Sequence, residues 1–462
     1  MVKLSFHGAA ETVTGSKYLL ETDHARVLID CGLFQGLKHL RERNWANLPF
    51  SPASLDAVVL THAHIDHIGY LPRLVKTGYR KAIFCTPPTE ELAEILLYDS
   101  ARNHEDDAEY ANRKGFSKHQ PALPLYESAD VSHTIKLLHG VGCEKWFNPA
   151  GDVWCRYHNA GHLLGSAMIE VEVRREAGPP TRILFSGDVG RYGAPLYHDP
   201  APPTPCDYLI CESTYGDRDH GPQKILDQLA EVVNAAVARG GPMVTASFAV
   251  GRAQQLIFLL RVLEKAGRIP ELPIYLDSPM AASATLIFHK YHDEHDMSED
   301  RTISPEAALR ASNVHVMRTV DESKHVNGVR GPAIIIASNG MMTGGRILHH
   351  LKQRLPDPTA TVVLGGYMAE GTRGRALQEG AKRIRIHGQD VPVRCHVAEI
   401  SAISGHAGRS ELLRWLKPLA APKRTFMTHG EIHSANALAT TLREERGWDV
   451  VVPRMGEAFE LA

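Results

Sequence analysis

A dense run of histidine and aspartate residues directly behind an apolar segment constrains this chain more than any other feature. Residues 57–60 (Ala-Val-Val-Leu) read as a buried strand, and residues 61–69 carry His62, His64, Asp66 and His67. On a continuous helix His62 and His64 would point to nearly opposite faces, because spatial neighbours lie three or four positions apart. On a tight loop all four side chains can converge, and imidazoles mixed with a carboxylate suit zinc better than iron or manganese. A solvated polar loop is the plain alternative, which the density and irregular spacing of the cluster disfavour.

Further metal-competent side chains follow other apolar segments. His162 stands in a glycine-flanked turn, Asp188 follows residues 182–185, and His429 follows residues 424–427, which read as a strand. Loops at strand ends are where open α/β sheets place their sites, so these residues can gather at one edge. Seven ligands are too many for one tetrahedral zinc with an open position. They suit two metals that share one carboxylate, with a water or hydroxide between them.

Asp30 ends another apolar run, residues 26–29, and allows two interpretations. A carboxylate at a strand end is commonly a turn or cap residue. It can equally orient a ligand histidine by accepting the proton on its second ring nitrogen. The residues alone leave both interpretations open.

Length and composition bound the kind of protein. A chain of 462 residues predicts about two or three domains. The formal net charge of -2 means that a nucleic-acid partner would have to be held by a local basic surface. The seven scattered cysteines include no Cys-x-x-Cys pair, which favours a reducing compartment over disulfides or a thiolate zinc site. No signal peptide and no membrane-length apolar run is evident, so we expect a cytoplasmic location.

The pattern of elements changes after Glu212. From residue 242 to residue 364 the order strand, Gly/Ser turn and amphipathic helix repeats, which is typical of a parallel sheet covered by helices. Turns at residues 247–252 and 338–345 enter helices and offer free N–H groups suited to phosphate, although such turns in α/β domains are also commonly plain connectors. Candidate substrate contacts there are Arg252, Ser338, Asn339 and Gly340. The basic segment 371–386 is either a solvated face or a track for a nucleic-acid backbone.

Several of these segments resemble a known family. Thr61-His62-x-His64-x-Asp66-His67, Gly161-His162 and Ser186-Gly187-Asp188 resemble the signature of the metallo-β-lactamase fold, and Asp30 matches its first motif. Residues 210–216, 404–408 and 428–431 are similar to motifs A, B and C of its β-CASP branch, and residues 247–254 and 338–342 also resemble that branch. The resemblance covers nearly the whole chain and extends to prokaryotic ribonucleases related to the endonuclease of the eukaryotic cleavage and polyadenylation complex.

The resemblance implies an α/β protein made of an αββα sandwich in two segments, residues 1–214 and 394–462. A β-CASP domain with a parallel sheet flanked by helices, residues 215–393, would be inserted between them. By the same resemblance, one zinc is held by His62, His64, His162 and Asp188, and a second zinc by Asp66, His67, Asp188 and His429. His406 would be the general acid, held by Glu212, with Asp66 also in a catalytic role.

The implied function is a zinc-dependent ribonuclease acting by two-metal hydroxide attack on RNA phosphodiester bonds. Endonuclease action, with or without 5′-to-3′ exonuclease action, fits the family, and the products would be a 5′-phosphate and a 3′-hydroxyl. We expect single-stranded RNA as partner and a homodimer, and no membrane partner. The alternatives are a DNA nuclease of the same branch, whose members typically carry an apolar residue at the position of His429, and a small-molecule hydrolase, which would need neither the insertion nor His406.

Overall fold

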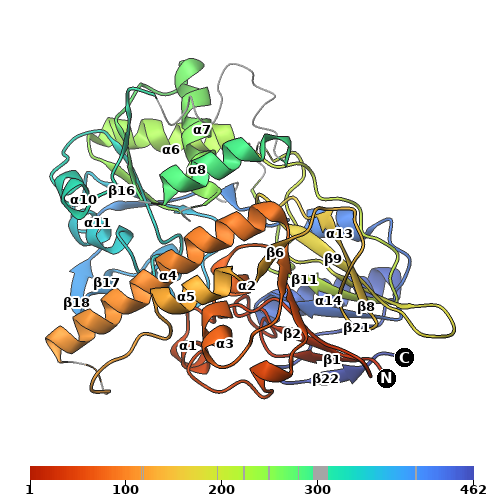
Figure 1. Ribbon diagram of the computed structural model, residues 1–462. Coiled ribbons are helices and arrows are strands. Elements are labelled where there is room, and N and C mark those ends of the chain that lie inside the picture. Colours follow the sequence, from red (N-terminus) through yellow and green to blue (C-terminus); the bar gives the residue numbers. More distant parts are fainter. Residues whose placement is uncertain are drawn as a thin grey trace. The chain divides into compact units, whose positions relative to one another are not determined.

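The computed structural model describes residues 1–115, 117, 119–194, 196–221, 224–247, 250–278, 280–294, 311–400 and 403–462 (Figure 1). Two compact units divide the chain. The first contains residues 1–35, 39–219 and 405–462, and the second contains residues 36–38 and 220–404.

Two mixed sheets form the centre of the first unit. Within the described residues, one sheet has the order β22-β1-β2-β3-β4-β5-β6, made of Ala458–Glu460, Lys3–Phe6, Tyr18–Glu21, Arg26–Ile29, Ala57–Val59, Ile83–Cys85 and Leu138–Gly140. The other has the order β21-β20-β11-β10-β9-β8-β7, made of Val450–Val451, Arg424–Thr428, Tyr208–Glu212, Thr181–Phe185, Ala167–Val173, Val153–Asn159 and Phe147–Ala150. Strands β3 and β4 are parallel, as are β10, β11 and β20, so the carboxyl ends within each set share one edge.

Apolar side chains from both sheets pack into one core. Phe6 of β1 lies with its ring centroid 5.1 Å from that of Phe426 of β20, and Tyr18 lies 6.0 Å from Phe185. On the outer face of the second sheet, Leu209 and Met427 pack against α13 (Arg409–Leu416) and α14 (Ile432–Arg446). Figure 1 shows α13 and α14 beside this sheet.

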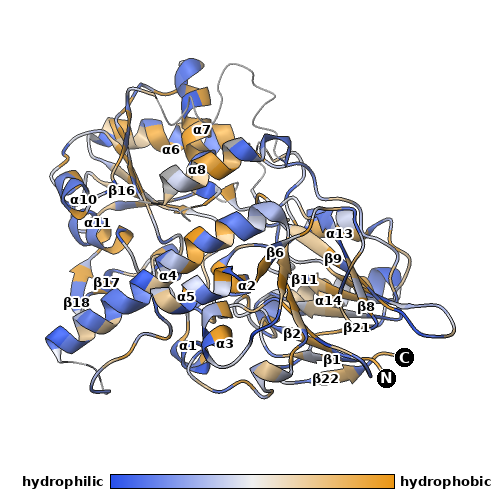
Figure 2. Cartoon of the chain, viewed as in Figure 1, coloured by the Kyte–Doolittle hydropathy of each residue, from blue (hydrophilic) through white to orange (hydrophobic). Residues whose placement is uncertain are grey.

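Further helices accompany the first sheet. They are α1 (Lys38–Arg43), α2 (Ile65–Ile68), α3 (Leu71–Lys76), α4 (Pro87–Lys114) and α5 (Ser128–Ile135), with a 3₁₀ turn at Pro52–Ser54. Helix α4 starts where the Thr86 hydroxyl caps the backbone N–H of Thr89, and ends at Gly115 with φ 66°. Its buried residues recur at helical spacing, including Thr89, Ala93, Leu97 and Ala101, and the rest of the helix is mostly hydrophilic (Figure 2). The acidic residues of this helix, from Glu90 to Glu109, are exposed or half-buried.

The second unit contains the predicted parallel sheet. Its order is β14-β13-β15-β12-β16-β19, made of Val314–Val316, Ile274–Asp277, Ile334–Ala337, Met243–Ala246, Thr361–Gly365 and His396–Ile400, and every described pairing is parallel. Helices α6 (Ile225–Arg239), α7 (Arg252–Lys265), α8 (Ala281–Lys290), α10 (Val320–Val326), α11 (Ile347–Arg354) and α12 (Arg373–Gln378), and a 3₁₀ turn at His292–Glu294, connect the strands. A hairpin of β17 (Arg383–Ile386) and β18 (Gln389–Pro392) forms a separate two-stranded sheet whose apolar side chains join the core of this unit.

The chain passes from the first unit to the second after Asp219 and returns to the first unit at Gly405. From the sequence, these domain boundaries were predicted after residue 214 and before residue 394. Strand β19 accounts for the second difference, because it pairs along its whole length with β16. The domain bounds stay a prediction. Among the helices that the structure describes, none combines the length and the apolar character that crossing a membrane demands.

Candidate metal centre

The histidine loop leaves the carboxyl end of β4, and its backbone is held by neighbouring loops. His62 and His64 lie on an extended stretch, and His64 has the extended conformation of a helix N-cap. Asp66 and His67 lie on the single turn of α2, so the expected loop is a helical turn over its second half. This combination brings together side chains that a continuous helix would separate.

Backbone hydrogen bonds fix the position of this turn. The carbonyl groups of Ile65, Asp66 and His67 accept hydrogen bonds from the N–H groups of Leu33, Ser16 and Cys31, at 3.0, 2.9 and 2.7 Å. Gly32 lies so close that a Cβ at this position would stand 1.6 Å from the Asp66 carbonyl oxygen. Only glycine allows this approach of the two segments.

The other ligand candidates also follow strands of the first unit. His162 lies in the turn between β8 and β9, after Gly161 with φ 70°, and Asp188 follows β10. His429 follows β20 in the left-handed region, with φ 48°, and its N–H donates to the Ala9 carbonyl at 2.8 Å. All seven predicted ligand residues therefore meet at one edge of the paired sheets.

Four of them form a first group, whose ligand atoms lie within 4.8 Å of one another: His62, His64, His162 and Asp188. Nδ1 of His64 lies 3.0 Å from Nε2 of His62 and 3.2 Å from Nε2 of His162. Oδ2 of Asp188 lies 3.3 Å from Nε2 of His62 and 3.5 Å from Nε2 of His162.

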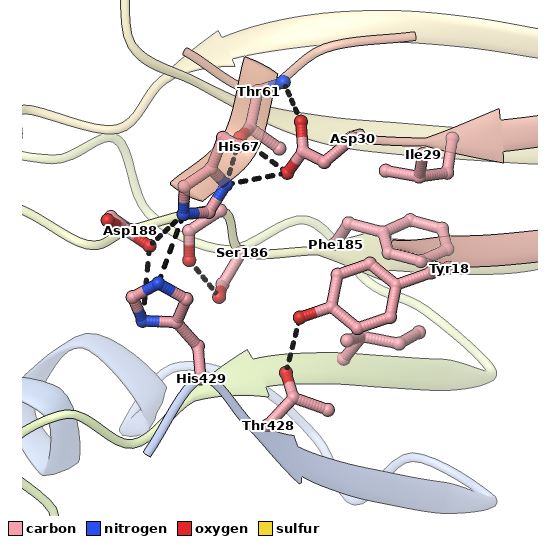
Figure 3. A pocket seen from close by; sticks show the side chains of 12 residues that line it. Tyr18, Ile29, Asp30, Thr61, His67, Phe185, Ser186, Asp188, Thr428 and His429 are labelled. Carbon is pink, nitrogen blue, oxygen red and sulfur yellow. Dashed lines mark hydrogen bonds and ion pairs between the residues drawn. The ribbon is translucent and has the colours of Figure 1, made fainter. Parts of the chain in front are cut away.

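Asp66, His67 and His429 form a second group. The Nε2 atoms of His67 and His429 lie 3.0 Å apart, and Oδ2 of Asp66 lies 3.5 Å from Nε2 of His429. The other oxygen of Asp188, Oδ1, lies 3.4 Å from Nε2 of His67 and 3.5 Å from Nδ1 of His429. Asp188 thus faces one group with each oxygen. Figure 3 shows His67, Asp188 and His429 converging beside a pocket that Tyr18 and Phe185 line on its other side.

These residues fit metal ions. Within the part of the chain that the structure describes, neither oxygen of the buried Asp188 carboxylate has a hydrogen-bond partner. In a tetrahedral zinc site with bonds of about 2.0–2.1 Å, neighbouring ligand atoms lie about 3.3–3.4 Å apart. The separations of 3.0–3.5 Å within both groups are close to that spacing. Nitrogen atoms that face one another this closely cannot all be satisfied by protons, whereas cations between them would satisfy all of them.

The pKa shifts of most of these residues favour the protonation states that bind cations. Burial lowers the pKa of His62, His64 and His162, which favours the neutral imidazole that binds metal. Burial also opposes ionisation of Asp188, but the surrounding histidines, His429 first, hold its pKa well below its usual range. His67 differs, because the Asp188 and Asp30 carboxylates outweigh burial and raise its pKa well above the ordinary value. The Asp188 and Asp30 carboxylates therefore favour a positive charge beside them.

Asp30 lies beside a ligand candidate, which favours the orienting role among the two interpretations that the sequence left open. Its Oδ2 lies 2.8 Å from Nδ1 of His67 and accepts a hydrogen bond from the Thr61 hydroxyl at 2.8 Å, and its Oδ1 accepts one from the Thr61 N–H at 2.8 Å. Nε2 of His67 is thereby directed toward the centre.

Two threonines and a tyrosine near the centre were not predicted from the sequence. The hydroxyl of Thr61 lies 3.0 Å from Nδ1 of His62, and that of Thr214 lies 3.0 Å from Nδ1 of His429. The buried hydroxyl of Tyr18 donates to Oγ1 of Thr428 at 3.2 Å, directly before His429. Thr61 and Thr214 stand inside segments that the sequence had singled out, whereas no pattern marks Tyr18.

His406 and Glu212 form a pair beside the first group. Nδ1 of His406 lies 3.2 Å from Oε1 of Glu212, and its Nε2 lies 3.8 Å from Oδ2 of Asp188. Glu212 is fixed by the N–H groups of Val189 at 2.7 Å and Thr214 at 3.2 Å. Burial lowers the pKa of His406, but Glu212 and then Asp188 outweigh it and raise the pKa above the ordinary value.

The candidate substrate contacts lie in the second unit. Arg252 begins α7, and its Nη1 donates to the carbonyl of Gly365 at 2.6 Å. Ser338, Asn339 and Gly340 follow the carboxyl end of β15, where Oγ of Ser338 donates to Oγ of Ser278 at 3.4 Å and Oδ1 of Asn339 accepts from the N–H of Met341 at 2.9 Å. Their contact with substrate stays a prediction. Phe248 and Ala249 of the expected turn 247–252 lie outside the described residues.

Two arginines of the basic segment make hydrogen bonds within the second unit. Arg373 donates to the backbone carbonyls of Arg385, Met342 and Thr343, and Arg375 pairs with Glu379 and donates to the carbonyl of Met368. Their charge is partly used inside the unit, which favours the solvated-face interpretation for these two residues.

Three family models match the chain. They are the metallo-β-lactamase superfamily over residues 12–142, the Beta-Casp domain over residues 253–377, and the Zn-dependent metallo-hydrolase RNA specificity domain over residues 390–453. Together with the clustered ligand atoms, they define a metal-binding hydrolase of the metallo-β-lactamase superfamily. Within that superfamily the chain belongs to the β-CASP family, which confirms the family and the fold class expected from the sequence.

Relatives that match over almost the whole of this chain support this membership. The chain is 35% identical over 454 residues to Ribonuclease TTHA0252 of Thermus thermophilus, covering 97% of this chain and 98% of the relative. It is 31% identical over 470 residues to an RNase J-like protein of Methanocaldococcus jannaschii, covering 99% of each chain. It is 32% identical over 456 residues to transcription termination factor FttA of Methanosarcina mazei, covering 96% of this chain and 69% of that one.

A solved structure agrees in fold. The crystal structure of a protein of unknown function from Enterococcus faecalis V583 covers 100% of both chains with a TM-score of 0.53 and 13% identity. At this identity the likeness shows the fold alone.

Proposed function

We propose that this protein is a zinc-dependent ribonuclease that hydrolyses phosphodiester bonds of single-stranded RNA. The observation that carries the proposal is the placement of Asp188 between two groups of ligand atoms, with the His406–Glu212 pair beside it. The names of the relatives, a ribonuclease and an RNase J-like protein, favour RNA as the substrate. A homodimer and a cytoplasmic location remain predictions from the sequence.

Two zinc ions are the proposed cofactors. His62, His64, His162 and Asp188 would hold one, and Asp66, His67, Asp188 and His429 the other. When bound, the ions would polarise the phosphodiester and supply a water molecule that ionises near neutral pH. Asp66, whose pKa is lowered chiefly by its hydrogen bond with His429 despite burial, would stay ionised and accept a hydrogen bond from the attacking water.

His406 is the proposed general acid. Hydrolysis that yields a 5′-phosphate and a 3′-hydroxyl expels an alkoxide, which needs a proton to leave. Because Glu212 and Asp188 favour the imidazolium form, Nε2 of His406 can carry that proton while Nδ1 stays on Glu212. Replacing His406 by alanine should lower RNA turnover at least ~100-fold and leave about two zinc ions bound, since an acid is not a ligand. Loss of zinc in this variant would refute the assignment.

The exposed His433 offers a matched control, because it stands four residues after His429 and its side chain is 84% exposed. The His433→Ala variant should keep wild-type turnover and zinc content. A loss of turnover equal to that of His406→Ala would mean that the assay does not single out the proposed acid.

Incubating the zinc-loaded protein with RNAs labelled at either end tests the reaction itself. Each RNA would carry a 5′-triphosphate or a 5′-monophosphate, and the product ladder separates internal cleavage from stepwise removal of nucleotides at the 5′ end. Cleavage of DNA but not RNA would support the DNA nuclease alternative. Hydrolysis of a small ester or lactam without action on RNA would support a small-molecule hydrolase and overturn the proposal.

A further inference from the structure

An exposed arginine lies behind the ring that flanks His406. The ring centroid of Tyr215 lies 6.3 Å from that of His406, and the guanidinium carbon of Arg218 lies 5.1 Å from the centroid of Tyr215. One aromatic ring therefore separates a permanent positive charge from the proposed general acid. The Tyr215 side chain is buried, whereas that of Arg218 is 48% exposed.

The guanidinium is held in place from two sides. Its Nη1 donates to Oδ2 of Asp217 at 3.0 Å, and Oδ1 of Asp217 accepts from the Ser434 hydroxyl at 2.8 Å. The face of Tyr215 supports the same group by a cation–π contact. His433 is another titratable group near this carboxylate, with its Nε2 3.9 Å from Oδ2 of Asp217.

The backbone around Arg218 is also fixed, and it is fixed to the segment that carries His406. The carbonyl of Arg218 accepts from the N–H of Arg409 at 3.0 Å, and Oδ1 of Asp219 accepts from the N–H and hydroxyl of Ser410 at 2.7 and 2.8 Å. Arg409 and Ser410 start α13, three residues after His406. A shift of the acid and a shift of the arginine are thus coupled through a short, hydrogen-bonded stretch.

Among the residues that the structure describes, the pair with Asp217 engages only part of the hydrogen-bonding capacity of the Arg218 guanidinium. A guanidinium carries five N–H donors in a planar fork suited to phosphate, and the carboxylate takes one nitrogen. As an isolated surface ion pair, Arg218–Asp217 would contribute little to stability. The supporting ring, the serine and the backbone ties are more than such a pair needs, and together they orient a cation that remains open to solvent.

We propose that Arg218 binds a phosphate of the RNA chain next to the scissile one, on the side of the leaving group. This inference rests on the proposed function. Cleavage to a 3′-hydroxyl makes O3′ of the upstream nucleotide the leaving atom, and His406 must stand beside that atom to protonate it. The next phosphate beyond the upstream nucleotide then lies on the His406 side of the centre, where Tyr215 and Arg218 follow. Arg218 is in this account a substrate-binding residue that selects a polynucleotide over a small phosphodiester.

Arg218→Ala tests this inference with two substrates. A labelled single-stranded RNA presents the neighbouring phosphate, whereas a dinucleoside monophosphate, a small diester that expels the same 3′-alkoxide and so also needs the general acid, has none. The variant should raise KM for RNA about tenfold, as the loss of one charge-assisted hydrogen bond predicts. Its rate on the dinucleoside monophosphate should stay within about twofold of wild type. The slope of log KM against log salt should fall by about 0.7, the value for one phosphate contact on a single strand.

Arg268→Ala is the matched control, because Arg268 is 41% exposed and also pairs with an aspartate, Asp227, at 2.7 Å. It should leave KM and the salt slope unchanged. Arg218→Lys should keep the salt slope and recover part of the lost affinity, since it retains the charge but not the fork.

Two outcomes would overturn the inference alone. One is an equal loss on RNA and on the small diester, which would mean that Arg218 only supports Tyr215 and His406. The other is an unchanged KM and salt slope in a chain that cleaves RNA. A wild-type protein that does not cleave RNA at all would instead overturn the proposed function together with the inference.

Discussion

Lys17 provides a quantitative test of the packing beneath the metal centre. Its side chain is fully buried, and the ammonium donates to the carbonyls of Gly15 and Gly32 and lies 4.6 and 4.9 Å from the ring centroids of Phe34 and Tyr70. Burial lowers its pKa from 10.5 to about 8. Gly32 is the residue that packs against the Asp66 carbonyl, so this lysine ties together the segments that support the histidine turn.

The sign and size of the effect follow from linkage. Between pH 8 and pH 10.5 the unfolded chain binds the Lys17 proton and the folded chain does not, so stability must rise with pH in this window. Below pH 8 that stability is absent, because both states are protonated. The difference between 10.5 and about 8, at about 1.4 kcal/mol per pH unit, corresponds to at most about 3 kcal/mol. The carbonyl oxygens and ring faces favour the charged form and act in the opposite direction, which makes this an upper bound.

Replacement by methionine removes the titration while keeping the length of the side chain. The free energy of unfolding of Lys17→Met, relative to wild type, should therefore fall by up to about 3 kcal/mol between pH 7 and pH 10.5. All five tryptophans, at positions 45, 146, 154, 415 and 448, belong to the first unit, so urea unfolding followed by tryptophan fluorescence reports on that unit. The exposed Lys145 is the control, and Lys145→Met should show no such pH dependence. The reasoning would be refuted if the free energy of unfolding of Lys17→Met kept a constant offset from that of wild type. It would also be refuted if the variant gained stability relative to wild type as pH rises.

Two further predictions concern the ligands and their support. His429→Ala should reduce bound zinc from about two to about one per chain in elemental analysis, because it removes a ligand from the second group only; full retention of both ions would count against this ligand. Asp30→Asn should weaken zinc binding by ~10–100-fold in competition with a chelator, because the carboxylate that orients His67 is lost. An unchanged affinity would show that Asp30 only shapes its turn.

The clustering of the ligand residues could be predicted because each of them lies in a short local sequence pattern. Each ligand residue follows an apolar strand, and parallel strands bring their carboxyl ends to one edge, so convergence of His62, His162 and Asp188 could be expected. The helical turn of α2 was not expected, because its geometry depends on hydrogen bonds from Ser16, Cys31 and Leu33, which lie in other segments. The same holds for Thr214 and Tyr18, whose partners stand 215 and 410 residues away in the chain.

The second unit shows the same division between local pattern and long-range packing. Its alternation of strand and helix predicted a parallel sheet, and that sheet is present. The membership of β19 depends on its pairing with β16, about thirty-five residues earlier, which no local pattern records. The basic segment 371–386 was a weaker predictor of substrate contact, because Arg373 and Arg375 donate hydrogen bonds to backbone carbonyls inside the unit.

RNA cleavage as a function of returned zinc tests the central claim most directly. The protein would first be freed of metal by a chelator, and zinc would then be added back in known amounts per chain while cleavage of a labelled single-stranded RNA is measured. We predict no cleavage by the metal-free protein and a rise that levels off at about two zinc ions per chain. Cleavage that survives complete removal of metal, or a plateau at one ion per chain, would contradict a two-metal ribonuclease.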